Sequence, residues 1–160
     1  RPAFDANRQA EIEAVKPVIE RLKETGWTFG SHTWGHIRLD SRPLESVQRD
    51  TVRWAEEVGS LVGPTNILFY PHGGRPDGDD WHSTGPVFQY LQSQGFRIFA
   101  SVGINSFSYI KKDISAVICD RLHPDGTTLR NGKALEWYSQ FYDAREIIDL
   151  DVRPDLGVTW

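Results

Sequence analysis

Apolar residues in the first part of the chain recur every three or four positions. The residues concerned are Ile12, Val15, Ile19 and Leu22. This spacing is typical of one face of an amphipathic helix and predicts a helix over residues 8–25, ended by Gly26. Pro17 lies inside the pattern, and because proline removes a backbone donor, we expect a kink or a helix start near Lys16.

A second amphipathic pattern predicts a helix over residues 42–62. We expect Ser41 to be its N-cap, because a serine hydroxyl accepts a hydrogen bond from the first free N–H groups of a helix. Pro43 suits the first turn, where no backbone donor is needed. Gly63 and Pro64 then end the helix.

Short apolar runs separate the helical patterns and predict buried strands. These runs cover residues 27–29, 66–70, 96–102, 114–119 and 147–152. Two further helices are predicted at residues 86–94 and 133–141, and the Gly, Asp and Pro residues of 73–85 predict a loop. Helices that alternate with short strands favour parallel βα units. We therefore expect one α/β domain over residues 1–160.

Bulk composition excludes some functions. The chain has 160 residues, which suits one domain with a hydrophobic core. Its formal net charge is −4, whereas a nucleic-acid-binding protein needs a basic face, so we expect no nucleic-acid partner. No apolar run approaches the ~20 residues of a transmembrane helix, so we expect no transmembrane segment.

Two further counts concern the ends of the protein and its thiol chemistry. The single cysteine, Cys119, cannot form an intrachain disulfide, and we expect it to be a buried small apolar residue.

Methionine is absent, and the chain opens with Arg1 and Pro2, without a signal peptide. We therefore expect a fragment of a longer protein that lacks an N-terminal portion.

Histidines follow three of the predicted strands: His32 with His36, His72, and His123. Since active sites of α/β folds form at the carboxyl ends of the strands, these side chains are candidates for one site. Two histidines four positions apart can present both imidazoles to one zinc ion. Metalloproteases have a glutamate after the first histidine, and Thr33 stands there instead, which excludes that class. Two unrelated polar residues of a loop are the alternative.

The segment Ser31-His32-Thr33-Trp34-Gly35-His36 resembles the H-[ST]-x-x-H motif of the NodB-type polysaccharide deacetylases, carbohydrate esterase family 4. The resemblance implies part of a distorted (β/α) barrel in which both histidines bind a divalent metal, usually zinc. It also implies that Thr33 holds the loop by hydrogen bonding.

The next strand extends the resemblance, which covers about residues 10–125. Phe69-Tyr70-Pro71-His72-Gly73 is similar to the family motif R-x-P-Y-G or its variant F-x-Y-P-Y-G, and Phe69 stands at the position of the arginine. The resemblance implies that this loop lines the substrate groove and that the backbone N–H of His72 contributes to an oxyanion hole. The helix and strand of residues 88–99 also look like the family.

The chain departs from the family upstream of His32. The family's first motif is a strand ending in two aspartates, a catalytic base and a third metal ligand, but only Asp5 precedes His32 and no apolar strand leads to it. We therefore expect the C-terminal part of a catalytic domain, missing its N-terminal strand or strands. Its partner would be the missing N-terminal segment, and this part alone would be inactive.

The remaining motifs are less clear. The fourth has no counterpart unless Asp80 and Trp81 supply it. Leu122 and His123 resemble the last motif, which implies that His123 is the general acid, although a loop histidine is the alternative. His72 is a further ligand, a substrate contact or a loop residue. We expect His82 to be exposed. We also expect the aspartates of this loop to be solvated rather than metal ligands: Asp77, Asp79 and Asp80.

The resemblance implies metal-dependent removal of acetyl groups from a polysaccharide: an N-acetylglucosamine polymer, peptidoglycan or acetylated xylan. Aromatic rings stack on sugars, so the expected substrate contacts include Trp34, Tyr70 and Trp81, although most aromatic residues fill cores. The resemblance adds Pro71, from the loop that lines the groove. Because such polymers lie outside the cell, we expect an extracellular or cell-envelope location. The alternatives are a non-catalytic carbohydrate-binding domain with the same fold, a metal-dependent hydrolase of another substrate, and a structural metal module.

Overall fold

The structure is a computed structural model of the chain. It describes residues 2–78, 85–102, 109–111 and 115–121, together with residues 136, 139 and 140. The predicted strand 147–152 and most of the predicted helix 133–141 therefore lie outside the described residues.

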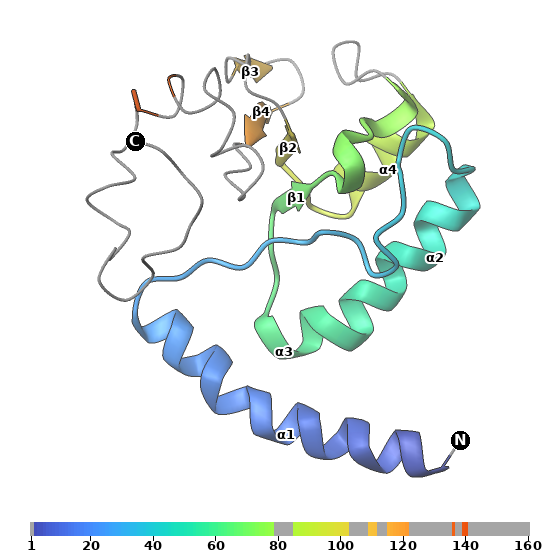
Figure 1. The fold of residues 1–160 in the computed structure, drawn as a ribbon. Helices are drawn as coiled ribbons and strands as arrows, with labels where there is room; N and C mark the ends of the chain where they lie inside the picture. The colour runs from blue at the N-terminus through green and yellow to red at the C-terminus, as the bar shows by residue number, and fades with distance from the viewer. Residues whose placement is uncertain are drawn as a thin grey trace.

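Four strands form one sheet in the order β1-β2-β4-β3 (Figure 1). The strands are β1 (Ile67–Phe69), β2 (Ile98–Val102), β3 (Tyr109–Lys111) and β4 (Ala116–Arg121). β1 pairs with β2 and β2 with β4 in parallel, whereas β3 is antiparallel to β4. The predicted parallel units are confirmed, and their carboxyl ends meet at one edge. β3 was not predicted, and no barrel closure is present among the described strands.

The helices lie on the outside of this sheet. They are α1 (Pro2–Glu24), α2 (Leu44–Trp54), α3 (Ser60–Val62) and α4 (Pro86–Ser93). A π-helical turn, Ala55–Gly59, joins α2 to α3, so the predicted helix 42–62 is interrupted by a local change of helix type. Among the described helices, none has both the length and the apolar character that a bilayer crossing requires.

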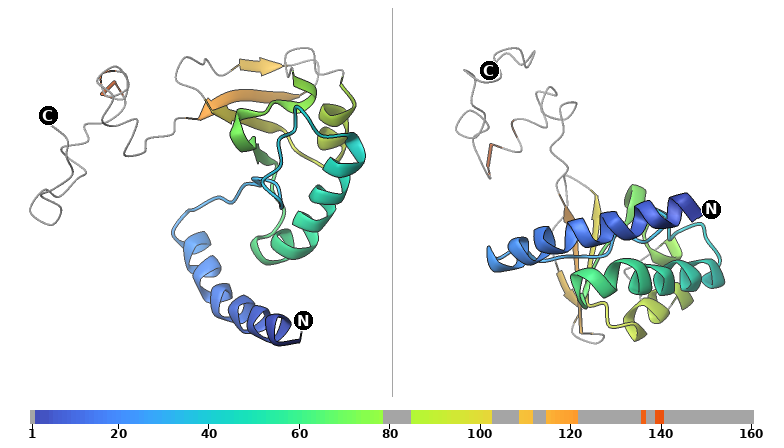
Figure 2. Two further views of the ribbon diagram at one scale, coloured as in Figure 1. Left: turned by 45° about the vertical axis from the view of Figure 1, so that its right-hand side comes forward. Right: turned by 90° about the horizontal axis from the view of Figure 1, so that it is seen from below.

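The core lies between the sheet and the helices α2 and α4, which cover the same side of it (Figures 1 and 2). Phe88 of α4 stacks on Phe99 of β2 with ring centroids 4.6 Å apart, and both side chains are fully buried. Tyr70, directly after β1, is also fully buried and packs beside Phe99. These rings fix the position of the carboxyl end of β1.

Helix α1 contacts α3 and forms an ion pair with the π-helical turn through Arg8 and Glu57, and Figure 2 shows it apart from the sheet. Ile19 is its one buried apolar residue among those with described side chains, whereas Val15 and Val18 are exposed. The predicted helix 8–25 is confirmed, but it begins earlier, at Pro2, and passes through Pro17, so of the two alternatives near Lys16, a kink or a start, the start is wrong. The residues before Pro17 are mostly good helix formers, and they extend the helix toward the N-terminus.

Two predictions about the segments around the H-x-x-x-H motif, residues 32–36, are wrong. Residues 27–29 are not a strand, because only Ser31 pairs with β1, through backbone hydrogen bonds of 2.9 and 2.8 Å to Ile67 and Phe69. Ser41 is not the N-cap of α2: Pro43 holds that position in an extended conformation, and no side chain caps it.

Gly30 lies where the segment leading to His32 passes close to β1. A Cβ atom at this position would lie 2.5 Å from the ring of Phe69. A side chain here would have to displace the Phe69 ring, so glycine favours the close approach of this segment to β1. The segment that leads to His32 is thereby held along β1.

Candidate active site

Three histidines converge at the carboxyl end of β1. The ring centroids of His32 and His36 are 4.8 Å apart, and those of His36 and His72 are 4.4 Å apart. His36 and His72 are exposed and His32 is half-buried, so the cluster is open to solvent. The structure thus brings together two of the three histidine positions singled out from the sequence. The third, His123, lies outside the described residues.

His32 is oriented by the backbone of β1. Its Nδ1 lies 2.9 Å from the carbonyl oxygen of Phe69. Burial lowers the pKa of His32, against the opposite effect of this hydrogen bond, and the charge of Arg121 lowers it further. A neutral imidazole whose Nδ1–H is held by a carbonyl presents Nε2 outward, which is the usual form of a metal-ligating histidine.

The pair His32 and His36 fits one metal ion. With zinc–nitrogen bonds of about 2.0–2.1 Å and tetrahedral angles, two imidazole centroids lie roughly 5 Å apart, close to the 4.8 Å found here. In the part of the chain that the structure describes, no group of three or more His, Cys, Asp or Glu side chains could hold a metal. Among the described residues, His32 and His36 are therefore the pair that could hold a metal ion.

Three residues of the cluster have strained backbones. Thr33, His36 and His72 have φ angles of 60°, 51° and 54°. The left-handed conformation costs an L-residue about 1–2 kcal/mol, and it is a clear outlier for a β-branched residue such as Thr33. Such strain persists only where surrounding contacts hold it, and it concentrates at functional sites.

Hydrogen bonds within the loop support the strained conformation. Thr33 Oγ1 accepts from the backbone N–H of Ile37 at 3.1 Å, and Ser31 Oγ accepts from the N–H of Thr33 at 3.2 Å. Thr33 therefore makes the loop-holding hydrogen bond that the resemblance implied. From outside the loop, the carboxylate of Asp50 accepts from the N–H groups of Trp34 and Gly35.

Asp50 was not found from the sequence. It lies on α2, well beyond the motif, and only the packing of α2 against the loop brings the two together. A carboxylate on an amphipathic helix carries no local signal for such a contact.

The side chain of Trp34 is directed toward α2 and the π-helical turn that follows it. Its indole N–H donates to Glu57 at 2.9 Å, and the guanidinium of Arg53 lies 3.5 Å from the ring centroid. The side chain is 41% exposed, but Arg53 covers one face of its ring. At most one face of Trp34 can therefore stack on a sugar.

The other expected substrate contacts differ in accessibility. Tyr70 and Pro71 are fully buried, so a direct side-chain contact with a polymer finds no support in this geometry. Trp81 lies outside the described residues. Asp77, expected to be solvated, is exposed but also caps α4, because its carboxylate accepts from the N–H groups of Val87 and Phe88 at 3.2 and 2.9 Å.

Arg121, at the end of β4, was also missed. Its Cζ lies 5.7 Å from the centroid of the Phe69 ring, and its Nε is buried without a hydrogen-bond partner within the described ranges. In the resemblance, Phe69 stands at the arginine position of the family motif. The guanidinium of Arg121, from β4, lies over the ring of Phe69. The Nε–H of this half-buried side chain can therefore donate to an oxygen acceptor.

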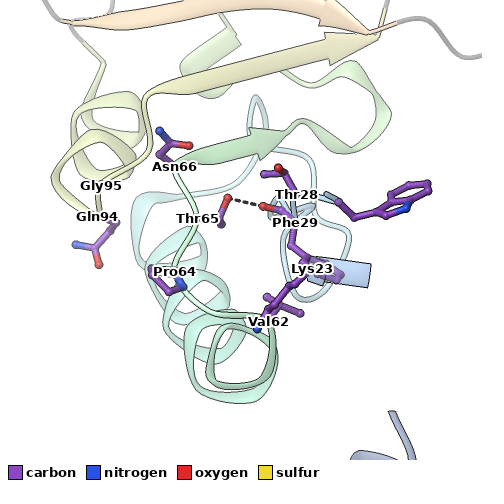
Figure 3. Close-up of a pocket in the computed structure, with 10 residues that line it drawn as sticks. Lys23, Thr28, Phe29, Val62, Pro64, Thr65, Asn66, Gln94 and Gly95 are labelled. Carbon is purple, nitrogen blue, oxygen red and sulfur yellow. Dashed lines mark hydrogen bonds between the residues drawn. The ribbon is translucent and has the colours of Figure 1, made fainter. Parts of the chain in front are cut away.

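A pocket of about 570 Å³ lies at the opposite end of the sheet (Figure 3). Its walls include Lys23, Thr28 and Phe29, together with Asn66 before β1 and Gly95 before β2. These are the amino ends of the strands, whereas the histidines follow a carboxyl end. None of the predicted site residues lines this pocket.

The fold and the cluster define an α/β domain with a histidine pair suited to a metal at the carboxyl end of its sheet. A sequence model of the polysaccharide deacetylase family matches residues 4–96, more than half of the chain. The chain therefore belongs to the polysaccharide deacetylase family, and the resemblance seen in the motifs is confirmed. Comparisons with curated proteins and with solved structures gave no match.

Proposed function

We propose that this domain contributes to metal-dependent hydrolysis of acetyl groups on a polysaccharide, with His32 and His36 as two of the metal ligands. The observation that carries the proposal is the orientation of the pair. His32 is held through Nδ1 by the Phe69 carbonyl, and the His36 ring lies beside it at 4.8 Å. The family assignment supplies the class of reaction and the polymeric substrate.

A divalent ion, zinc by the preference of imidazole ligands, would supply Lewis-acid activation and a nucleophile at neutral pH. The described residues have separate tasks. His32 and His36 would hold the ion, and the backbone N–H of His72 would stabilise the negative charge that develops on the acetyl oxygen. We further propose His123 as the proton donor to the leaving group.

The third ligand and the base are proposed to be carboxylates from a segment outside the described residues. The backbone edge of residues 28–30 that faces away from β1 supports this proposal. Within the described part of the chain, the N–H groups of Thr28 and Gly30 have no recorded backbone acceptor. An extended segment paired there would run directly beside His32, which follows on the same stretch. Such pairing would continue the sheet toward the barrel that the family implies.

A second candidate function is a non-catalytic carbohydrate-binding domain that retains the deacetylase fold. The lack of a three-ligand group among the described residues favours it. For either function, we propose an extracellular or cell-envelope location, where the polymeric substrates of the family lie.

The test compares residues 1–160 with the product of the complete reading frame, if that frame encodes a longer protein. Zinc binding is measured by calorimetry, and acetate release is measured from acetylated chito-oligosaccharides, peptidoglycan fragments and xylo-oligosaccharides. We expect zinc-dependent acetate release that is lost in His32→Ala, with the shorter chain much less active. Glycan binding that is unchanged in His32→Ala, without acetate release, would establish the binding domain instead. Equal turnover by both proteins would show that no further carboxylate segment is needed.

A further inference from the structure

Asp50 makes an unusual pair of contacts with the loop that carries the histidines. Its Oδ1 accepts from the backbone N–H of Trp34 at 2.8 Å and its Oδ2 from that of Gly35 at 2.7 Å. Two successive N–H groups that converge on one anion form a concave binding site for negative charge. Here the anion is a carboxylate of the protein itself, carried by the neighbouring helix α2.

The two N–H groups lie between the strained residues of the motif. Thr33, at φ 60°, precedes them and His36, at φ 51°, follows them. Left-handed backbone at these residues is unfavourable, so the loop needs external contacts to keep this shape. Bonds of backbone donors to a charged acceptor are stronger than neutral ones. Asp50 is therefore suited to hold the strained segment.

The sequence also accommodates the carboxylate. A Cβ atom at position 35 would lie 3.0 Å from Oδ2 of Asp50. A larger residue at position 35 would push the carboxylate away from the N–H groups. Gly35 and Asp50 thus form one unit, although they are 15 residues apart.

We propose that Asp50 is a positioning residue for the metal site: by holding the N–H groups of Trp34 and Gly35, it keeps the imidazole of His36 beside that of His32. The inference rests on the proposed metal-binding function of this pair. Asp50 itself contacts neither ring, because its two oxygens point at the backbone. Without it, the loop relaxes from the left-handed conformation and the two rings separate.

The experiment uses the full chain with Asp50→Asn, Asp50→Ala and a control, Glu45→Gln. Glu45 is an exposed carboxylate at the start of the same helix, with no contact recorded in the described structure, so its substitution changes the charge alone. Asn at position 50 keeps the size of the side chain but offers one acceptor oxygen, which makes it the milder variant should the alanine variant fail to fold. Thermal melts identify the folded variants.

Two measurements need no metal. In the wild type and in Glu45→Gln, we expect the amides of Trp34 and Gly35 to be protected from hydrogen exchange and a nuclear Overhauser contact to link the rings of His32 and His36. In Asp50→Ala both signals are lost, and in Asp50→Asn, which keeps one acceptor oxygen, both are weakened. If the protection and the ring contact persist in folded Asp50→Ala, the inference is wrong.

The third measurement is the affinity for Co²⁺ and Zn²⁺ by titration. We expect the Asp50 variants to bind each ion roughly 10–100-fold more weakly, as for the loss of other residues that orient metal ligands, and Glu45→Gln to bind as the wild type does. Unchanged affinity in a variant that has lost the ring contact would overturn the inference. If the wild type binds neither ion, the proposed function fails, and the ring contact and amide protection still decide the role of Asp50.

Discussion

The Nδ1 atom of His32 and the carbonyl oxygen of Phe69 lie 2.9 Å apart and connect the H-x-x-x-H motif to the last residue of β1. Because a carbonyl oxygen only accepts, the neutral ring has its proton on Nδ1 and its lone pair on Nε2. One contact therefore fixes both the tautomer and the direction of the ligating nitrogen. The segment of residues 69–73 therefore contributes to the site through the backbone carbonyl of Phe69 as well as through His72.

This contact predicts the tautomer of His32 in solution. At pH 8, above its lowered pKa, His32 is neutral, and we expect its Nδ1 to give the ¹⁵N shift of a protonated ring nitrogen and its Nε2 that of an unprotonated one. Long-range ¹H–¹⁵N spectra of the metal-free chain measure both shifts. The urea-unfolded chain is the control, since its histidines have no fixed acceptor. A proton on Nε2 in the folded chain would contradict the structure.

The cap on α4 is expected to stabilise the domain. Asp77 accepts from the N–H groups of Val87 and Phe88, so Asp77→Ala should lower the free energy of unfolding by about 1 kcal/mol, within the usual range for a lost N-terminal cap. Urea denaturation measures this change. Glu11→Ala, an exposed substitution within α1 that has no recorded contact in the described structure, is the control and should have little effect.

A double-mutant cycle sharpens the same prediction. A Cβ atom on Gly85 would lie 2.1 Å from the Asp77 carboxylate, while the φ of −67° at this position suits any residue. Gly85→Ala should therefore destabilise the wild type by displacing the carboxylate, and destabilise it less when residue 77 is already alanine. Additive effects of the two substitutions would show that this contact does not form.

Local elements of the fold could be predicted because their signals are local. Pro86 begins α4 and Gly95, at φ 96°, follows its end, close to the predicted range 86–94. The apolar run 66–70 contains β1. By contrast, the pattern of residues 27–29 could not distinguish an extended segment from a paired strand, since pairing depends on the neighbour available.

The site could be predicted only in part, for the same physical reason. His32, His36 and His72 follow from short motifs, and the structure brings them together. Asp50 and Arg121 act across long sequence separations, through the packing of α2 on the loop and the register of β4 in the sheet. Neither packing nor register is contained in a motif, so these two residues became visible only in three dimensions.

Cys119 is expected to react slowly with thiol reagents. Burial raises the pKa of its thiol, and the neighbouring charge of Asp120 raises it further. A raised pKa means a smaller thiolate fraction at every pH below it, and the thiolate is the nucleophile. Alkylation of the folded chain at pH 7.5 should therefore be slower than in urea, and its rate should rise with pH with a midpoint above that of the unfolded chain. Cys119, expected to be buried, is half-buried in the structure, and equal rates and midpoints would show that this position does not protect its thiol.

The three neighbouring histidines should differ in their contribution to metal binding. We expect His32→Ala and His36→Ala each to weaken zinc binding by more than the roughly 10–100-fold typical of lost orienting residues, because each removes a ligand. His72→Ala should leave zinc affinity nearly unchanged. The ring of His72 lies 4.4 Å from that of His36, but the described residues contain no three-ligand group.

Competition with a chromophoric zinc chelator measures these affinities, and His82→Ala serves as the control, since His82 has no assigned role. A His72→Ala variant that loses zinc as completely as His36→Ala would make His72 a third ligand. The metal site would then be built from the two motifs of this chain, without a carboxylate from another segment. Zinc affinity that survives His32→Ala and His36→Ala alike would place the metal elsewhere and remove the basis of the proposed function.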